Sequence, residues 1–132
     1  MAHIIVAEDD EIVGEIVRET LTASGHAVGV LADGVEALKV IRLKNPDLVI
    51  LDCNMPGLGG VLVLREMRGA GELCEIPVLM LTGRRGQQDV ELAMFQGAND
   101  YMTKPFDPEE LGFRVDVLLE ISRARQGRRT DG

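Results

Sequence analysis

The chain has 132 residues, enough for about one domain, and its 45% hydrophobic and 27% charged content is ordinary for a folded globular protein. No apolar run approaches the roughly 20 residues that span a membrane, and the N-terminus lacks the basic region of a signal peptide, so we expect a cytoplasmic protein. The net charge of −8 argues against a domain body that binds nucleic acid through its phosphates. The two cysteines, Cys53 and Cys74, are expected to be reduced thiols.

Short apolar runs alternate with longer amphipathic runs along the chain, which predicts five strand–helix units in succession. In chain order, the predicted elements are a strand at 4–7, a helix from residue 10 or 11 to 24, a strand at 27–31, a helix from the N-cap at 33 to about 44, a strand at 47–52, a helix from residue 59 or 60 to 68, a strand at 77–82, a helix at 87–96, a strand at 99–103 and a helix from 108 to about 123. The first, third and fourth strands are apolar throughout, as expected of strands that helices cover on both faces. The predicted fold class is therefore α/β, a doubly wound three-layer sandwich around a parallel five-stranded sheet.

Local signals support these boundaries and set the extent of the domain. Asp33 is a good N-cap, and Glu36 follows it three residues later, as in a capping box. We assign residues 1–124 to a single domain. Residues 125–132 are polar and basic, and we expect a frayed tail or the start of a linker there.

Carboxylates follow two of the predicted strands at the point where each strand ends. Glu8 and Asp9 come after the first strand, and Asp52 ends the third. In the flavodoxin-like strand order 2-1-3-4-5 these two strands are neighbours, and ligands bind at the carboxyl edge of such sheets. Three carboxylates held that close repel one another, so either one takes up a proton or a divalent cation lies among them. An open cluster of oxygen ligands favours Mg²⁺.

Two other polar residues follow the remaining strands of the predicted edge. Thr82 ends the fourth strand, and Lys104 follows the fifth, directly before a proline. A threonine hydroxyl can donate to a phosphoryl oxygen, and the lysine can reach across to Asp52. Each feature alone is more often without a role, and the acids at 8–10 alone are typical of a solvated helix start. Together they indicate a site for a cation and a phosphoryl group.

At this point the chain resembles the receiver domain of two-component response regulators, over residues 3 to about 123. Four motifs carry the resemblance: IIVAEDDE, LDCNMPGLGG, VLMLTG and GANDYMTKPF. Their separations fit together, with 43 residues from Asp9 to Asp52, 30 from Asp52 to Thr82 and 22 from Thr82 to Lys104. Each motif is weak alone, and the set is highly specific.

The resemblance implies a phosphoacceptor switch that catalyses only its own phosphorylation and dephosphorylation. Asp52 would accept a phosphoryl group from a sensor histidine kinase or a histidine phosphotransfer protein. Phosphorylation would then shift an equilibrium between inactive and active surfaces. The residues implied are Glu8, Asp9, Asp52 and the backbone carbonyl of Asn54 as Mg²⁺ ligands, Thr82 and Lys104 as phosphoryl-binding groups, and Tyr101 as the aromatic that turns inward when Thr82 moves.

Some positions depart from the family pattern or vary within it. Gly59 replaces a residue that is usually polar, which would loosen that loop without touching the chemistry. Asn54 and Arg84 lie two residues after Asp52 and Thr82, where the family tunes the lifetime of the phosphate. Arg84 is as often a solvated loop charge as a shield over the phosphate.

The last predicted helix resembles that of receivers that precede a winged-helix DNA-binding domain. Asp100, Glu110 and Arg114 match charged positions of that subfamily's dimer face, formed by helix 4, strand 5 and helix 5. The basic partner expected for Glu110 is replaced by Val90, and plain surface charges explain these residues equally well. We expect no membrane contact and no direct DNA binding by this domain, although an attached effector domain would bind DNA.

Two other function classes remain open from the residues. A Mg²⁺-dependent phosphohydrolase also uses an aspartate after a strand, but it needs a second acid two residues later, where this chain has Asn54. A docking module that is never phosphorylated would have lost the acids or the lysine, and all are present. Whether the chain acts alone or as the receiver part of a longer regulator stays open.

Overall fold

The computed structural model describes the backbone of residues 1–131 and the side chains of residues 1–127. Its five strands form one parallel sheet in the order β2-β1-β3-β4-β5, as the sequence predicted. The strands are β1 (His3–Ala7), β2 (Ala27–Leu31), β3 (Leu48–Leu51), β4 (Val78–Thr82) and β5 (Asp100–Thr103). Their bounds agree with the predicted ones to within one residue at each end.

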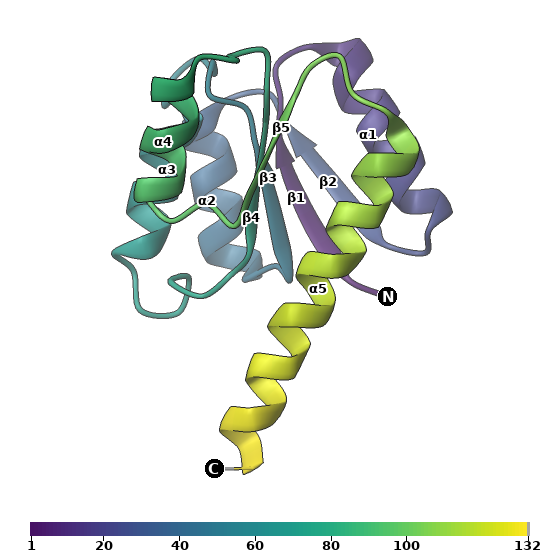
Figure 1. Ribbon diagram of the computed structural model, residues 1–132, viewed down its shortest axis with the longest axis vertical. Coiled ribbons are helices and arrows are strands. Elements are labelled where there is room, and N and C mark those ends of the chain that lie inside the picture. The colour runs from purple at the N-terminus through teal and green to yellow at the C-terminus, as the bar shows by residue number, and fades with distance from the viewer. Residues whose placement is uncertain (132) are drawn as a thin grey trace.

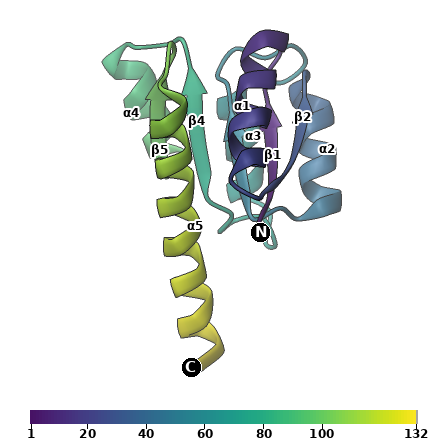
Figure 2. The same cartoon turned by 90° about the vertical axis from the view of Figure 1, so that its right-hand side faces the viewer.

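Five helices in the described chain cover the two faces of this sheet. They are α1 (Glu11–Ala23), α2 (Gly34–Lys44), α3 (Gly60–Arg68), α4 (Gln87–Phe95) and α5 (Pro108–Asp131). Helices α2, α3 and α4 lie on one face, and α1 and α5 lie on the other (Figures 1 and 2). The result is the three-layer sandwich expected from the alternating pattern, with every strand arrow pointing to the same edge (Figure 1).

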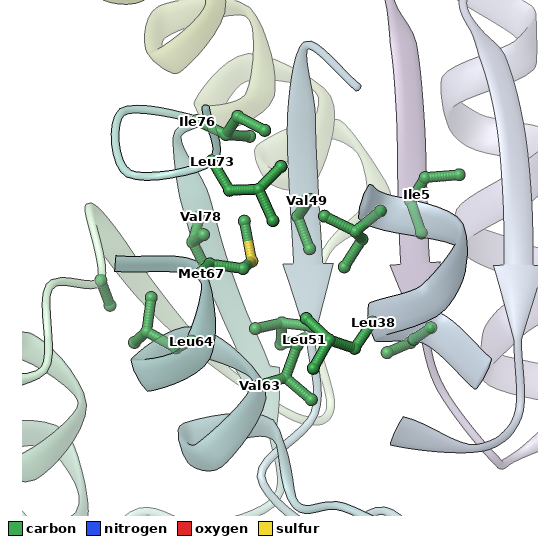
Figure 3. Packing of buried hydrophobic residues seen from close by; sticks show 14 of the residues in the cluster. Ile5, Leu38, Val49, Leu51, Val63, Leu64, Met67, Leu73, Ile76 and Val78 are labelled. Carbon is green, nitrogen blue, oxygen red and sulfur yellow. The ribbon is translucent and has the colours of Figure 1, made fainter. Parts of the chain in front are cut away.

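The core is aliphatic and divides into two clusters, one on each face of the sheet. On the α2–α3 side, Leu38 of α2 and Leu64 and Met67 of α3 pack against β3 residues such as Val49 (Figure 3). Strands β3 and β4 are buried at every position, which explains their unbroken apolar sequence. Each fully buried side chain of this size contributes roughly 1.5–3 kcal/mol, so the central strands are the most firmly held part of the sheet.

Two aspartates begin the helices that follow β1 and β2. The Asp10 carboxylate accepts hydrogen bonds from the Ile12 and Val13 amides at 2.9 and 3.1 Å, and Asp33 caps α2 in the same way at 2.7 and 3.1 Å. The N-cap predicted at Asp33 is confirmed. Because Asp10 is used as a cap, only the first two acids of the 8–10 triplet are available to a site.

The predicted end of the last helix near residue 123 is wrong, because α5 continues to Asp131. The stretch expected to be a frayed tail from residue 125 is therefore helical as far as the structure describes it. Its residues are mostly good helix formers without proline, and the single Gly127 costs only about 1 kcal/mol against a helix already nucleated by packing. Figures 1 and 2 show α5 extending beyond the edge of the sheet opposite the strand arrowheads. Within the described chain, no helix combines the length and apolar character that a membrane span requires.

A half-buried arginine organises the loops at this opposite edge. The Arg68 guanidinium donates to the carbonyl oxygens of Gly97 at 2.9 and 3.0 Å, Ile76 at 2.8 Å and Cys74 at 3.2 Å, and to the Asn99 side chain at 3.0 Å. These are neutral acceptors, and burial accordingly lowers the pKa of Arg68 from its ordinary value. The side chain joins the end of α3 to the chain that leads into β4 and β5.

Candidate functional site

The backbone hydrogen bonds of the sheet continue past the strand ends and hold the predicted site residues in place. The amide of Glu8 donates to the Leu31 carbonyl at 2.9 Å, and the amide of Asp52 donates to the Ala7 carbonyl at 3.1 Å. On the far side, the Lys104 amide donates to the carbonyl of Thr82 at 2.9 Å. Each residue is therefore tied to the neighbouring strand, and the carboxyl edge presents them as one rigid row.

A lysine and two buried carboxylates form the centre of the site. The ammonium group of Lys104 lies 2.9 Å from Oδ2 of Asp52 and also contacts Oε1 of Glu8. The carboxylate side chains are only 7% and 3% exposed, and that of the lysine is 20% exposed. The other oxygens are also engaged, since Asp52 Oδ1 accepts from the Asn54 amide at 3.1 Å and Glu8 Oε2 accepts from the Asp10 amide at 3.2 Å. Both carboxylates are thus held in fixed orientations.

Burial and charge act in opposite directions on these groups. Burial raises the pKa of Glu8 above its ordinary value, although the hydrogen bond and charge of Lys104 offset part of the effect. Burial alone would lower the pKa of Lys104, but the two carboxylates outweigh it and raise that pKa. The site therefore holds a charged lysine and an excess of negative charge.

The excess charge makes this edge of the sheet a candidate metal site. Carboxylate oxygens of Glu8, Asp9 and Asp52 all lie within 4.8 Å of one another. Asp9 is exposed while the other two are buried, so the cluster opens to solvent on one side. Three carboxylates against one lysine leave a net charge of about −2, which a divalent cation would neutralise. The donor set is all oxygen, so it could hold a hard cation.

Thr82 and Tyr101 lie beside this centre, around the β4–α4 loop. Thr82 is fully buried, and its hydroxyl oxygen accepts a hydrogen bond from the Arg84 amide at 3.3 Å. The Tyr101 hydroxyl donates to the Arg84 carbonyl at 2.7 Å. Burial and the nearby Cys53 thiol raise the pKa of Tyr101, so its hydroxyl stays a hydrogen-bond donor. Burial likewise raises the pKa of Cys53, which argues against a reactive thiolate.

Arg84 connects the two loops that border the site. Its Nε donates to Oδ1 of Asn54 at 2.9 Å, and its NH1 group lies 3.3 Å from the Asp89 carboxylate of α4. The structure therefore brings together the two positions that we proposed for tuning phosphate lifetime. The arginine is not simply a solvated loop charge, since it spans from the β4–α4 loop to the β3–α3 loop.

The residues predicted for a dimer face form a separate group on β5 and α5. Arg114 lies 2.9 Å from the Asp100 carboxylate and 2.8 Å from that of Glu110. Both partners belong to the same chain, so Glu110 already has a basic partner in Arg114 although position 90 is a valine. Such half-exposed pairs contribute only about 0–1 kcal/mol each to stability. The dimer face itself stays a prediction.

The sequence did not predict one neighbour of the site, the start of α2. The amide of Gly34 donates to the Pro56 carbonyl, 3.0 Å away in the loop that follows Asp52. The only hint of this contact in the sequence is Gly34 itself, because a helix does not need a glycine directly after its N-cap.

Comparison with known proteins identifies the family and agrees with the fold. The family model described as the response regulator receiver domain matches residues 4–116. The chain therefore belongs to the receiver domains of two-component response regulators. The transcriptional regulatory protein CseB of Streptomyces coelicolor is 38% identical over 131 residues, which cover 98% of this chain and 55% of that protein. The chain thus spans about half the length of the curated relatives it matches.

Solved receiver structures superpose closely on this fold. A putative response regulator from Chloroflexus aurantiacus has a TM-score of 0.86 and 34% identity, covering 90% of this chain and 98% of that chain. The receiver domain of the Pseudomonas aeruginosa sensor histidine kinase PA1611, solved with a magnesium ion in its active-site cleft, has a TM-score of 0.83 and 28% identity. That alignment covers 90% of this chain and 98% of the other.

Proposed function

We propose that this receiver domain is a phosphoacceptor switch in which Asp52 takes a phosphoryl group from a sensor histidine kinase or a histidine phosphotransfer protein. The observation that carries the proposal is the position of Lys104, 2.9 Å from Asp52 Oδ2 at the edge that also gathers three carboxylates. A phosphoryl group on Asp52 would lie next to this ammonium group. Catalysis of phosphoryl transfer is mostly positioning and charge neutralisation, and both are built into this edge.

The metal that we propose for this site is Mg²⁺. Its ligands would be the carboxylates of Glu8, Asp9 and Asp52 and the backbone carbonyl of Asn54. The donor set fits, because Mg²⁺ prefers oxygen ligands and the solvent-exposed side at Asp9 leaves room for its waters. When bound, the ion supplies positive charge to the phosphoryl oxygens. The P. aeruginosa receiver, which shares this fold, has a magnesium ion in its active-site cleft, and this supports the choice of metal.

The chain's own residues account for the transfer itself. An oxygen of Asp52 forms the bond to phosphorus as the phosphorus–nitrogen bond of the donor phosphohistidine breaks, and the imidazole leaves. The hydrogen bond from the Asn54 amide and the contact with Lys104 keep the Asp52 carboxylate from rotating during attack. Lys104 neutralises the phosphoryl oxygens, and the Thr82 hydroxyl donates to one of them. We propose that no other reaction is catalysed, apart from hydrolysis of the same aspartyl phosphate.

The signal would leave the site through Thr82 and Tyr101. Both side chains are linked to Arg84, so movement of Thr82 toward a phosphoryl group changes the same loop that holds the tyrosine hydroxyl. Phosphorylation would then shift the population of the α4–β5–α5 face toward its active form. That face would control a partner or, through Asp100, Glu110 and Arg114, a homodimer.

The output would lie outside this domain. The relatives are about twice as long as this chain, and one is a transcriptional regulator, so we propose an attached effector domain or a separate partner in the cytoplasm. We expect no direct DNA binding by the receiver, because its net charge of −8 repels the phosphates.

Intact mass after incubation with acetyl phosphate tests the proposal, with and without Mg²⁺, on the wild type and Asp52→Asn. The expected result is one base-labile phosphoryl group on the wild type, only with Mg²⁺, and none on the variant. If neither acetyl phosphate nor beryllofluoride changes the protein, a phosphorylation-independent docking module replaces this proposal. Steady release of phosphate from unrelated monoesters would instead indicate a phosphohydrolase.

A further inference from the structure

The backbone at the start of α2 packs directly against the backbone of the loop that follows Asp52. A Cβ at Gly34 would lie 1.7 Å from the carbonyl oxygen of Leu58 and 2.6 Å from its carbonyl carbon. Real Cβ atoms do not approach backbone this closely, so only glycine fits at this position. The Gly34 amide also donates to the Pro56 carbonyl at 3.0 Å, so the contact is bonded as well as tight.

The neighbouring residues of helix and loop repeat the close approach. Gly57 has a φ of +79°, and a Cβ there would lie 2.6 and 2.7 Å from the two oxygens of the Asp33 carboxylate. That carboxylate accepts hydrogen bonds from the Val35 and Glu36 amides, so the group that caps α2 also packs against the loop at Gly57. Two residues of the helix start thus face three consecutive residues of the loop.

The same loop is held at its other end by the site itself. A Cβ at Gly60 would lie 2.0 Å from the Asp52 carbonyl oxygen, and the Gly60 amide donates to the Cys53 carbonyl at 3.2 Å. Between these two anchors lies Asn54, whose amide donates to Asp52 Oδ1 and whose carbonyl is the proposed metal ligand. The path of the loop at Pro56–Leu58 therefore decides where the Asn54 backbone lies.

We infer that Gly34 is a positioning residue for the metal and phosphoryl site, because it lets the start of α2 act as a template for the Asn54–Leu58 loop. Helix α2 contributes no side chain to the site, so its influence passes only through the loop backbone. This inference rests on the proposed function, in which the Asn54 carbonyl binds Mg²⁺. It differs from a plain packing role, which would lower stability and leave the metal affinity of the folded protein unchanged.

Calorimetric titration of the metal-stripped full chain with Mg²⁺ tests the inference on wild type, Gly34→Ala and Gly112→Ala. The last variant is the matched control, since Gly112 is also helical and a Cβ there meets no atom within 4 Å. Each titration is made where circular dichroism shows the protein folded. We expect the Mg²⁺ dissociation constant of Gly34→Ala to rise by about 10-fold or more, the size typical of lost outer-shell support, and that of the control to stay within about 2-fold.

The outcomes separate the two proposals. Absence of Mg²⁺ binding by the wild type would overturn the proposed function and the inference with it. Wild-type affinity in folded Gly34→Ala would overturn the inference alone. Amide spectra of the two variants add a second readout, since displacement of the loop predicts shifts at residues 53–60 for Gly34→Ala only.

A second set of variants decides the question if Gly34→Ala does not fold. Gly57→Ala places its Cβ against the Asp33 carboxylate and also strains the backbone at a φ of +79°, so we expect weaker Mg²⁺ binding. Asp33→Ala in the same chain removes the steric obstacle and leaves the backbone strain. In the Asp33→Ala/Gly57→Ala double variant, at least half of the loss in log Mg²⁺ affinity caused by Gly57→Ala should be recovered. Asp33→Ala alone should mainly lower stability, because it removes the cap of α2. Simple addition of the two single effects, with no recovery, would contradict the template.

Discussion

Lys104→Met should destabilise the metal-free protein strongly at neutral pH. The substitution keeps most of the volume of the side chain and removes its charge. Glu8 and Asp52, with side chains 3% and 7% exposed, would then face each other without a counter-ion. Leaving a buried charge uncompensated typically costs about 3–5 kcal/mol.

The lower end of that range applies here, since the lysine side chain is 20% exposed and water reaches part of the site. Globular proteins gain roughly 2.1 cal/mol/K of unfolding entropy per residue, or about 0.28 kcal/mol/K for this chain. A loss of about 3 kcal/mol therefore corresponds to a fall in Tm of about 10 °C.

The loss should depend on pH in a defined direction. The folded-state pKa of Glu8 is raised above its ordinary value of 4.5, so its charged form costs stability, and that cost appears as the pH rises through the folded pKa. Without Lys104 this pKa rises further, because the lysine lowers it in the wild type. The difference between variant and wild type should therefore be large at pH 7 and shrink toward pH 4.5.

Thermal unfolding in EDTA at pH 5 and pH 7 measures both effects. The control is Lys39→Met on α2, where a 68% exposed lysine side chain lies 3.5 Å from Glu36 and contributes at most about 1 kcal/mol. Added Mg²⁺ should recover much of the stability of Lys104→Met, since the ion replaces the missing positive charge. Equal melting temperatures for Lys104→Met and wild type at pH 7, or a larger difference at pH 5, would refute the reasoning.

Three further predictions concern other parts of the molecule. Arg68→Leu removes the donor from the carbonyls of Cys74, Ile76 and Gly97, of which the last two are at least partly buried, and should cost roughly 2 kcal/mol in urea unfolding. Arg65→Leu, on the exposed side of α3, should cost less than about 0.5 kcal/mol, and equal effects of the two substitutions would contradict the role of Arg68. Gly112→Ala should stabilise the protein by roughly 0.5–1 kcal/mol, because position 112 is helical and a Cβ there meets no other atom. The urea midpoint should rise, and a lower midpoint would contradict an open helical position. Arg84→Ala removes the hydrogen bond to Asn54 and should speed the loss of the aspartyl phosphate roughly five-fold, which is equivalent to about 1 kcal/mol. Intact mass follows the decay, and an unchanged decay rate would mean that Arg84 does not influence the hydrolysis.

Some of the predictions from sequence were sound because they depended on short-range rules. Strand positions followed from unbroken apolar runs, and the helix start at Asp33 followed from its side-chain chemistry. The gathering of Asp52, Thr82 and Lys104 at one edge followed from the parallel topology, since each lies at the carboxyl end of its strand. The role of each of these residues in phosphoryl transfer stays a prediction for the experiments above.

The fold class and the set of polar residues at the carboxyl edge could thus be predicted from the sequence, because periodicity and strand ends depend on neighbouring residues. The strand order came from the flavodoxin-like pattern and was confirmed by the structure. The structure added that Glu8 is buried while Asp9 stays exposed, and that the third acid, Asp10, caps α1, because these differences arise only when β1 and α1 pack together. The hydrogen bonds of Arg68 and the packing of the loop against Gly34 could be seen only in the structure, because they join residues far apart in the chain. It also extended α5 to Asp131, because a packed helix continues through residues whose local preferences are too weak to end it.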